Sequence, residues 1–213
     1  GGHTGDEDSM LATLNLARQH NVQIGAHPSY PDRTNFGRIS MTIAADALEN
    51  ALKEQISALI QYAKASGTQV SYIKPHGALY HDVLLSNARF ASALKVARVF
   101  KLPLLIQALP SRDSYIKKAA ELGADLLFEA FADRAYCDTG KLVTRQFAHA
   151  VHSNMPKTLA QAHNLAFKGG TFSENKRWLA IAAQTLCVHS DSPDTIATII
   201  AIRECLDNPI NGA

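Results

Sequence analysis

Short apolar runs that predict strands alternate with amphipathic stretches that predict helices along most of this chain, and this order limits the folds open to it. The predicted strands are residues 21–28, 69–77, 102–109, 124–133 and 182–191. The predicted helices are residues 6–20, 48–63, 90–100, 111–122, 156–167 and 193–206. Strands separated by helices usually lie parallel, because a parallel connection needs a long crossover. The sequence therefore predicts an α/β protein with a parallel sheet. Periodicity alone leaves a barrel and an open doubly wound sheet as alternatives.

Composition narrows the classes of protein further. Of the 213 residues, 46% are hydrophobic and 19% are charged, which is typical of a globular chain and not of a disordered one. A net charge of +2 without a basic run gives no reason to expect a nucleic-acid partner. No apolar run approaches the roughly 20 residues of a membrane helix. The three cysteines form no CxxC pair, which favours a reducing compartment. With no repeat or linker, a single domain over residues 1–213 is expected.

Most of the predicted strands end in polar side chains, which are unusual in a buried core. The first strand ends at His27 with Asp32 close behind, the second at Lys74 and His76, the fourth at Asp133 and Arg134, and the last at His189 and Asp191. His3 and Asp6 precede the first helix in the same way. The loops that follow parallel strands converge on one face of the sheet, where ligands bind. We therefore expect one polar cluster at a single mouth.

Each of these residues also has a structural interpretation. Asp6 suits a helix N-cap, Asp32 suits an Asx turn, and Asp133 with Arg134 could form a structural ion pair. His27 and His76 could be strand-end histidines that bond to the backbone. Lys74 is harder to explain in this way, because a buried amine is costly unless it is paired or used.

The residue types in the predicted cluster suit two kinds of chemistry. Histidines with carboxylates can bind a divalent metal or act as general acid and base. Lys and Arg can stabilise negative charge that develops on a carbonyl or phosphoryl oxygen. No HExxH, GxxxxGK[ST], GxGxxG or GxSxG motif occurs, so neither the common phosphate loops nor a serine nucleophile is indicated. Hydrolysis of an amide or ester, or handling of a phosphorylated intermediate, fits these residues.

Five spaced segments resemble the LamB/YcsF family, also known as the family of 5-oxoprolinase A subunits. They are "GGHTGD", "IGAHPSYPDRTNFGR", "YIKPHGALY", "FEAFADRAYCDTGKLVTR" and "QTLCVHSDSP", and they span residues 1 to 193 in family order. The resemblance implies a seven-stranded β/α (TIM-like) barrel of the glycoside hydrolase/deacetylase type. It implies a cytoplasmic subunit that, with partner subunits B and C, uses ATP to open the lactam of 5-oxo-L-proline (pyroglutamate) to L-glutamate.

The resemblance also implies site residues. The matching positions are His3 and Asp6 in HxGD, His27 and Asp32 in GAHPxxPD, Lys74 and His76 in KPHG, Asp133, Arg134 and Tyr136 in FADRxY, Arg145 in an LVPR-like segment, and His189 and Asp191 in CVHGD. The family's opening strand, an LNxDLGE-like segment, has no counterpart here, so we expect an N-terminally short barrel that lacks its first strand. His81, Thr144 and Ser190 replace the residues usual in the family.

From these observations we expect Lys74, His76, His27, Asp6 and His189 to be catalytic. Substrate-binding residues are expected to be His3, Asp32, Asp133, Arg134, Tyr136, Arg145 and Asp191. Two rival hypotheses stay open. One is a metal-dependent amidase or deacetylase that works alone, with His27, His76 and His189 as candidate ligands. The other is a subunit that binds substrate without catalysing its conversion. ATP is the expected cosubstrate of the complex, and a divalent metal is a candidate cofactor.

Overall fold

The computed structural model describes residues 1–189 and 194–208, which form two compact units. Unit 1 comprises residues 1–106 and 113–126, and unit 2 comprises residues 107–112 and 127–213. Asp191, one of the expected substrate-binding residues, lies outside the described residues. Among the described residues, no helix is both long and apolar enough to cross a membrane.

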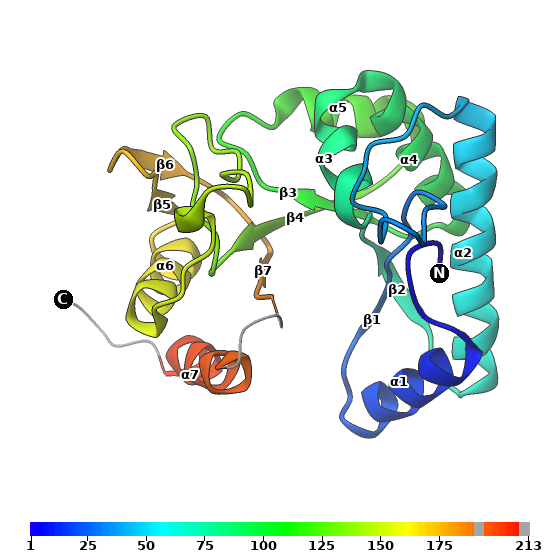
Figure 1. Ribbon diagram of the computed structural model, residues 1–213, viewed down its shortest axis with the longest axis horizontal. Coiled ribbons are helices and arrows are strands. Elements are labelled where there is room, and N and C mark those ends of the chain that lie inside the picture. Colours follow the sequence, from blue (N-terminus) through cyan, green and yellow to red (C-terminus); the bar gives the residue numbers. More distant parts are fainter. Residues whose placement is uncertain (190–193, 209–213) are drawn as a thin grey trace. The chain divides into compact units, whose positions relative to one another are not determined.

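Unit 1 holds three parallel strands and the helices that pack around them (Figure 1). In chain order its elements are α1 (Glu7–Gln19), β1 (Ile24–Ala26), α2 (Ala45–Ala65), β2 (Val70–Ile73), α3 (Gly77–Leu85), α4 (Asn87–Phe100), β3 (Leu104–Gln107) and α5 (Asp113–Leu122). Strand β2 lies between β1 and β3, and Ala26 pairs with Ile73 where the first two strands end.

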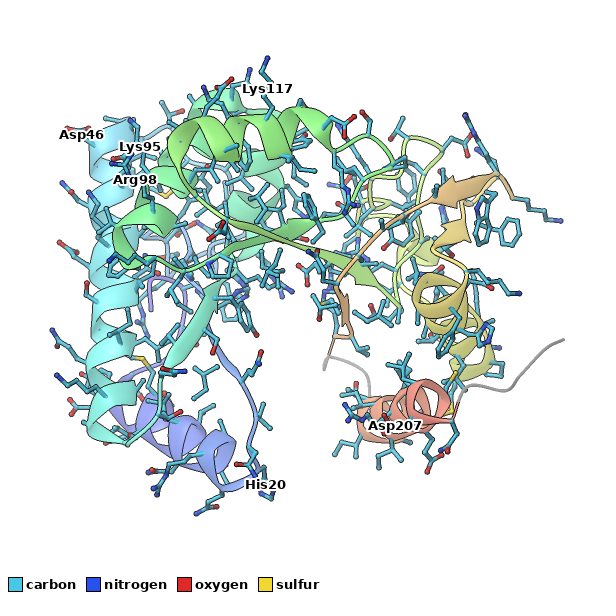
Figure 2. The ribbon with its side chains drawn as sticks, turned by 180° about the vertical axis from the view of Figure 1, so that it is seen from behind. His20, Asp46, Lys95, Arg98, Lys117 and Asp207 are labelled. Atoms are coloured by element: carbon cyan, nitrogen blue, oxygen red, sulfur yellow. The ribbon has the colours of Figure 1, made fainter. Side chains whose placement is uncertain are left out.

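The long helix α2 covers these strands, because its apolar residues form one stripe. Leu48, Leu52 and Ile56 are almost fully buried, and α2 packs against α1, α4, β1 and β2. Asp46, Lys95, Arg98 and Lys117 are exposed on the helices of this unit, as expected for surface positions of amphipathic helices (Figure 2). Helix α2 ends at Ala65, and Gly67 follows with a φ of +67°, so the glycine predicted to stop this helix adopts the left-handed conformation that favours it.

Unit 2 is built on a second parallel pair. Its elements are β4 (Leu126–Phe131), a short 3-10 helix η1 (Ala148–Ala150), α6 (Met155–Phe167), β5 (Gly170–Phe172), β6 (Trp178–Ala180), β7 (Thr185–Cys187) and α7 (Thr195–Asp207). Strands β4 and β7 pair in parallel, whereas β5 and β6 form an antiparallel hairpin. Helices α6 and α7 pack together over Ala132, Ala162 and Ile202.

The α/β class with parallel strands is thus confirmed, and each predicted strand and helix has a counterpart. Helix α3 and the β5–β6 hairpin were not predicted. Helix α3 follows His76 at once, so the sequence pattern of the preceding strand hid its start. Cys137, Cys187 and Cys205 form no disulfide among the described residues. The N-terminally short β/α barrel and the single domain over residues 1–213 stay predictions.

Candidate active site

The first group of predicted site residues meets where β1 and β2 end. Because these strands are parallel neighbours, the residues that follow Ala26 and Ile73 emerge side by side. His27 follows β1 directly, and Lys74 and His76 follow β2. His76 occupies the position just before α3 begins. The expectation that these three residues gather at strand ends is therefore met within unit 1.

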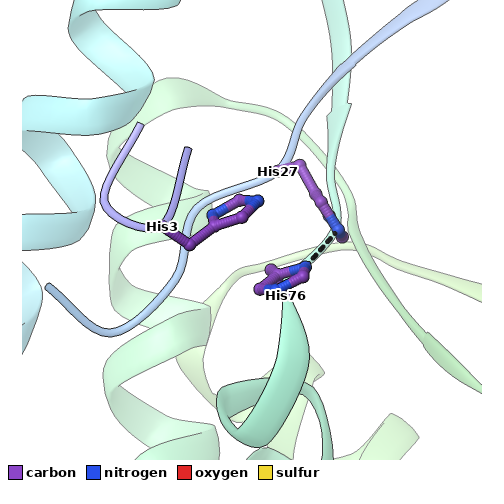
Figure 3. Close-up of side chains that lie close together, drawn as sticks. All are labelled: His3, His27 and His76. Carbon is purple, nitrogen blue, oxygen red and sulfur yellow. Dashed lines mark hydrogen bonds between the residues drawn. The ribbon is translucent and has the colours of Figure 1, made fainter. Parts of the chain in front are cut away.

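A third histidine joins this pair from the start of the chain. The residue His3 is only 9% exposed, and its ring stacks on that of His76, with ring centroids 3.7 Å apart and planes within 4° (Figure 3). His27 meets His76 nearly at a right angle, with its Nε2 atom 3.0 Å from His76 Nδ1. One nitrogen from each ring lies within 4.8 Å of the other two. We call His3, His27 and His76 the histidine cluster.

Main-chain carbonyls fix the orientation of two rings in the cluster. His27 Nδ1 lies 2.7 Å from the carbonyl oxygen of Lys74, and His76 Nε2 lies 2.9 Å from the carbonyl oxygen of Phe36. The hydrogen bonds to the backbone that were expected for His27 and His76 are therefore present. They account for one nitrogen of each ring and leave the two facing nitrogens for another role.

Burial changes the protonation of all three imidazoles. Desolvation, followed by the nearby charge of His76, lowers the pKa of His3 to about 3. Desolvation lowers the pKa of His27 to about 4, although this residue is exposed in the structure. Burial also lowers the pKa of His76. The cluster is consequently uncharged at neutral pH, and its imidazoles can accept a proton or donate a lone pair.

Two glycines allow the loop after β1 to reach these rings. Gly37 has a φ of +64°, and a Cβ atom there would lie 3.2 Å from both His3 Cβ and His76 Cδ2. Gly77 has a φ of +58°, and its Cβ would lie 2.4 Å from the carbonyl oxygen of Gly37. The main chain also joins the two segments, since His76 N donates to Pro28 O at 2.8 Å and Ala78 N donates to Gly37 O at 3.0 Å. Glycine at both positions permits this close approach.

Lys74 lies beside the cluster and is half-buried. Its Nζ atom is placed over the ring of Tyr80, 5.8 Å from the ring centroid. Its main-chain N donates to Ala26 O at 2.8 Å, and its carbonyl oxygen accepts the hydrogen bond from His27 Nδ1. The lysine therefore places a positive charge near neutral imidazoles at one strand end.

A cavity of about 500 Å³ adjoins the cluster within unit 1. His3 and His27 contribute to its wall, and the rest is largely apolar, including Met10, Leu14 and Ile56. A cavity of this size with a few convergent polar groups is typical of a small-molecule site.

The second group of predicted residues lies in unit 2. The carboxylate of Asp133 accepts hydrogen bonds from the main-chain N of His189 at 2.8 Å and from its ring Nδ1 at 2.9 Å. Burial opposes the charge of Asp133, but the hydrogen bonds from His189 and the electrostatic attraction between the two side chains outweigh it and lower the pKa of this carboxyl. The proposed ion pair between Asp133 and Arg134 is replaced by this Asp–His pair.

Arg134 and Tyr136 form hydrogen bonds with main-chain groups of unit 2. Arg134 is 4% exposed and donates to the carbonyls of Ala150 and Val143 at 3.0 and 2.7 Å. Tyr136 is fully buried, and its hydroxyl accepts the N–H of Phe131 at 2.7 Å. Arg145 is exposed, and its charge contributes to a lowered pKa of Arg134, after desolvation. Of these three residues, Arg145 is the one whose side chain a ligand can reach.

Asp6 and Asp32 both have local structural roles, and the N-cap predicted for Asp6 is confirmed. Asp6 caps α1, accepting from Ser9 N at 2.9 Å while Ser9 Oγ accepts from Asp6 N. Asp32 Oδ1 accepts from Asn35 N at 3.1 Å, which is a local bond to the backbone, but it reaches three residues on and not the two of the predicted Asx turn. Neither carboxylate belongs to the histidine cluster of unit 1. The single mouth, which requires residues of both units, stays a prediction.

Sequence reasoning missed the side chain that ties the cluster together. Gln55 on α2 accepts from Gly2 N at 2.8 Å and from Ser29 N at 3.0 Å, and it donates to Ser29 O at 2.9 Å. It thereby joins the segment that carries His3 to the loop that carries His27. The sequence offered one signal for this role, because Gln55 is an amide residue next to Leu52 and Ile56 in the apolar stripe of α2.

Comparisons with known proteins agree with this architecture. The family model described as the LamB/YcsF family matches residues 1–210. The chain is 41% identical over 206 residues to a Vibrio parahaemolyticus protein named as the A subunit of 5-oxoprolinase, covering 97% of this chain and 82% of that protein. A Pseudomonas putida protein, also named as a 5-oxoprolinase A subunit, is 39% identical over 209 residues, covering 97% and 81%.

A solved structure is similar as well. The crystal structure of the lactam utilization protein from Thermus thermophilus superposes with a TM-score of 0.88 at 30% identity, covering 97% of this chain and 82% of that one. Fold, sequence and motif order therefore agree over nearly all of the chain, and the protein belongs to the LamB/YcsF family.

Proposed function

We propose that this protein is the A subunit of an ATP-dependent 5-oxoprolinase, a hydrolase that opens the lactam ring of 5-oxo-L-proline to give L-glutamate. Its membership of the LamB/YcsF family and the names of relatives about 40% identical to it support the assignment. Subunits B and C are its proposed partners, ATP is consumed by the complex, and the cytoplasm is the proposed location. A β/α barrel of the glycoside hydrolase/deacetylase type is proposed as its fold, supported by the similarity to the Thermus thermophilus protein.

This proposal rests on one observation, which is that Lys74 lies close to the neutral imidazoles of the histidine cluster, beside a cavity. Opening a lactam, or its phosphorylated form, requires a base to take a proton from water and a positive charge to stabilise negative charge on oxygen. The facing nitrogens of His27 and His76 supply the base, and Lys74 supplies the charge.

Unit 2 contributes a second candidate for acid–base chemistry. Asp133 holds the ring of His189 through Nδ1, which leaves the lone pair on Nε2 as the proton acceptor. An aspartate that orients a histidine in this way is a common arrangement for a general base. We propose His189 as a catalytic residue, Asp133 as its positioning residue and the exposed Arg145 as a substrate contact. We assign Arg134 and Tyr136 to structural roles because of their burial.

The test is a reconstituted complex. This chain is purified together with subunits B and C, and ATP-dependent glutamate formation is measured with and without it. We expect no turnover in its absence and a loss of at least ~100-fold in kcat for His76→Ala, the order of magnitude of losing a general base. Near wild-type turnover in the variant would refute the assigned chemistry.

An amidase or deacetylase that acts alone is the second candidate, and the gathering of three histidines favours keeping it. It predicts hydrolysis of 5-oxoproline or of an acetylated amine by the isolated chain, without ATP and without partners. Activity only in the three-subunit complex would exclude this alternative.

A third alternative is a subunit that holds 5-oxoproline while its partners carry out the chemistry. It predicts that calorimetry detects 5-oxoproline binding to the isolated chain. It also predicts that Lys74→Ala and His76→Ala leave kcat of the complex unchanged when substrate saturates.

A further inference from the structure

The two facing nitrogens of His27 and His76 cannot form a hydrogen bond with each other while both rings are neutral. A carbonyl oxygen only accepts hydrogen bonds, so His27 Nδ1 donates to Lys74 O, and His76 Nε2 donates to Phe36 O. In a neutral imidazole the other nitrogen then carries a lone pair. His27 Nε2 and His76 Nδ1 are 3.0 Å apart, so two lone pairs face each other at hydrogen-bond distance. Such an arrangement needs a positive species that both can share.

A proton and a metal cation are the two species that satisfy this requirement. A shared proton would place one positive charge among three closely packed rings that also lie near the positively charged side chains of Lys74 and Arg38. A metal cation uses the same lone pairs without protonating either ring. The hydrogen bonds on the far side of the rings also favour a metal, because histidines that bind metals almost always donate their other N–H to a carbonyl or carboxylate.

The third ring completes a set of ligands. His3 stacks on His76, and its buried Nδ1 atom has no hydrogen-bond partner among the described residues. At zinc–nitrogen bonds of about 2.0–2.1 Å, two ligands of a tetrahedral ion lie about 3.3 Å apart. The separation between His27 and His76 is close to this value. The ligand atoms of the cluster lie within 4.8 Å of one another, so His3 must tilt out of its parallel stack to complete the set.

We propose that His3, His27 and His76 form a binding site for one divalent transition-metal ion, with zinc as the ion that fits best. Three imidazoles without a carboxylate suit zinc and its neighbours in the first row, whereas Mg²⁺ and Ca²⁺ prefer oxygen ligands. Three protein ligands leave a fourth position open, which is typical of catalytic zinc sites. The adjoining cavity, whose wall includes His3 and His27, gives that position access to a small molecule. A zinc ion there would supply a Lewis acid and lower the pKa of bound water, and in the zinc-bound protein His27 and His76 would activate water as ligands of the ion instead of accepting its proton themselves.

This ligand set differs from the one expected from sequence, which combined His27, His76 and His189. His189 is bound through Nδ1 to Asp133 in unit 2, whereas His3, His27 and His76 all belong to unit 1. The metal site does not depend on the 5-oxoprolinase assignment, because it follows from ring orientations alone.

The test measures binding on the isolated chain, without partner subunits or 5-oxoproline. Protein purified without chelator is stripped with EDTA, and Zn²⁺ is titrated by calorimetry, with elemental analysis after dialysis to count bound ions. Co²⁺ is added in parallel, because its visible spectrum reports tetrahedral nitrogen coordination. We expect one Zn²⁺ per chain, and binding at least ~100-fold weaker in His27→Ala and in His76→Ala, since loss of even an outer partner of a ligand costs roughly 10–100-fold.

The matched control is His20→Ala. His20 is exposed at the end of α1 and lies outside the cluster (Figure 2). This variant should bind Zn²⁺ like the wild type, and far-UV circular dichroism checks that each variant is folded. His27→Gln, which retains a polar side chain of similar length, serves if the alanine variant fails to fold. Absence of Zn²⁺ and Co²⁺ binding in the wild type, or equal binding in wild type and folded cluster variants, would overturn the proposal. The Zn²⁺ titration of the isolated chain tests this site even if the reconstituted complex forms no glutamate.

Discussion

The carboxylate of Asp133 holds His189 at two points, its main-chain amide at 2.8 Å and its ring Nδ1 at 2.9 Å. The residues are 56 positions apart in sequence, so the pair also joins the end of β4 to the segment after β7. This contact makes the stability of unit 2 depend on pH.

The first prediction concerns that dependence. The pKa of Asp133 is lower in the folded protein than in the unfolded chain, so its stabilising contribution is present above the unfolded value and is lost as pH falls through the folded value. We expect Asp133→Asn to cost roughly 1–3 kcal/mol of unfolding free energy at pH 7, and the difference from wild type to shrink as pH falls below the ordinary pKa of an aspartate. Urea unfolding from neutral pH down to about pH 3.5 measures it. A difference that stays constant over this range would show that the charge is not responsible.

The second prediction separates Lys74 from its neighbours in the same segment. If its ammonium stabilises charge on the reacting oxygen, Lys74→Ala lowers kcat of the reconstituted complex by at least ~100-fold, because one such group is worth roughly 10²–10³. His81→Ala is the control, since His81 is exposed on α3 and outside the histidine cluster. It should leave kcat close to that of the wild type. Similar losses in both variants would indicate general damage to α3 instead.

The third prediction concerns the close contact between Gly77 and Gly37. Gly77→Ala introduces both a left-handed non-glycine residue and a methyl group 2.4 Å from a carbonyl oxygen. Gly169→Ala is a matched control, because its φ of +67° is similar and nothing lies within 4 Å of the added Cβ. We expect each to lose about 1–2 kcal/mol from the backbone conformation, and Gly77→Ala to lose about 1–3 kcal/mol more from the clash. Urea unfolding compares the two, and equal losses would argue against the contact.

The fourth prediction distinguishes capping from catalysis at Asp6. The carboxylate of Asp6 accepts hydrogen bonds from Ser9, so Asp6→Ala should destabilise the protein, and Asp6→Asn, which can still cap α1, should be close to wild type. Turnover of the reconstituted complex should be retained in both. A ~100-fold loss of kcat in a stably folded Asp6→Asn variant would show that Asp6 is a catalytic residue.

The fifth prediction applies to Tyr136. Tyr136→Phe removes the acceptor of a buried main-chain N–H and should cost about 1–3 kcal/mol of unfolding free energy. Because the side chain is fully buried, KM for 5-oxoproline in the complex should not change. Thermal or urea unfolding and steady-state kinetics together measure both effects. An increased KM without a loss of stability would indicate a substrate contact.

The order of the main elements could be predicted from the sequence because periodicity directly reflects burial. The stripe of Leu48, Leu52 and Ile56 defined α2, and the strand ends placed His27 next to Lys74 and His76. Helix α3 was missed because Pro75 and Gly77 interrupt the pattern where it begins. The β5–β6 hairpin was missed because strands of three residues are too short to show alternation.

The membership of the candidate site was harder to predict than its location. His3 precedes the first helix and follows no predicted strand, so nothing local indicates that it stacks on His76. Its position depends on Gln55, which lies 53 residues from Gly2 and binds it through a single side chain. Arg134 and Tyr136 match the family motif, yet their bonds to backbone groups of unit 2 depend on tertiary folding, which motif spacing does not reveal.

The loop that follows β1 is fastened to the β2–α3 segment at both Pro28 and Gly37. Fixing the backbone of one residue costs roughly 1–2 kcal/mol of conformational entropy, and for these loop residues that cost is already met when unit 1 folds. A ligand that binds beside His27 and His76 therefore finds the main-chain carbonyls and rings largely in place. Little binding free energy is therefore lost to ordering this loop when the ligand binds, so the loop is preorganised for recognition.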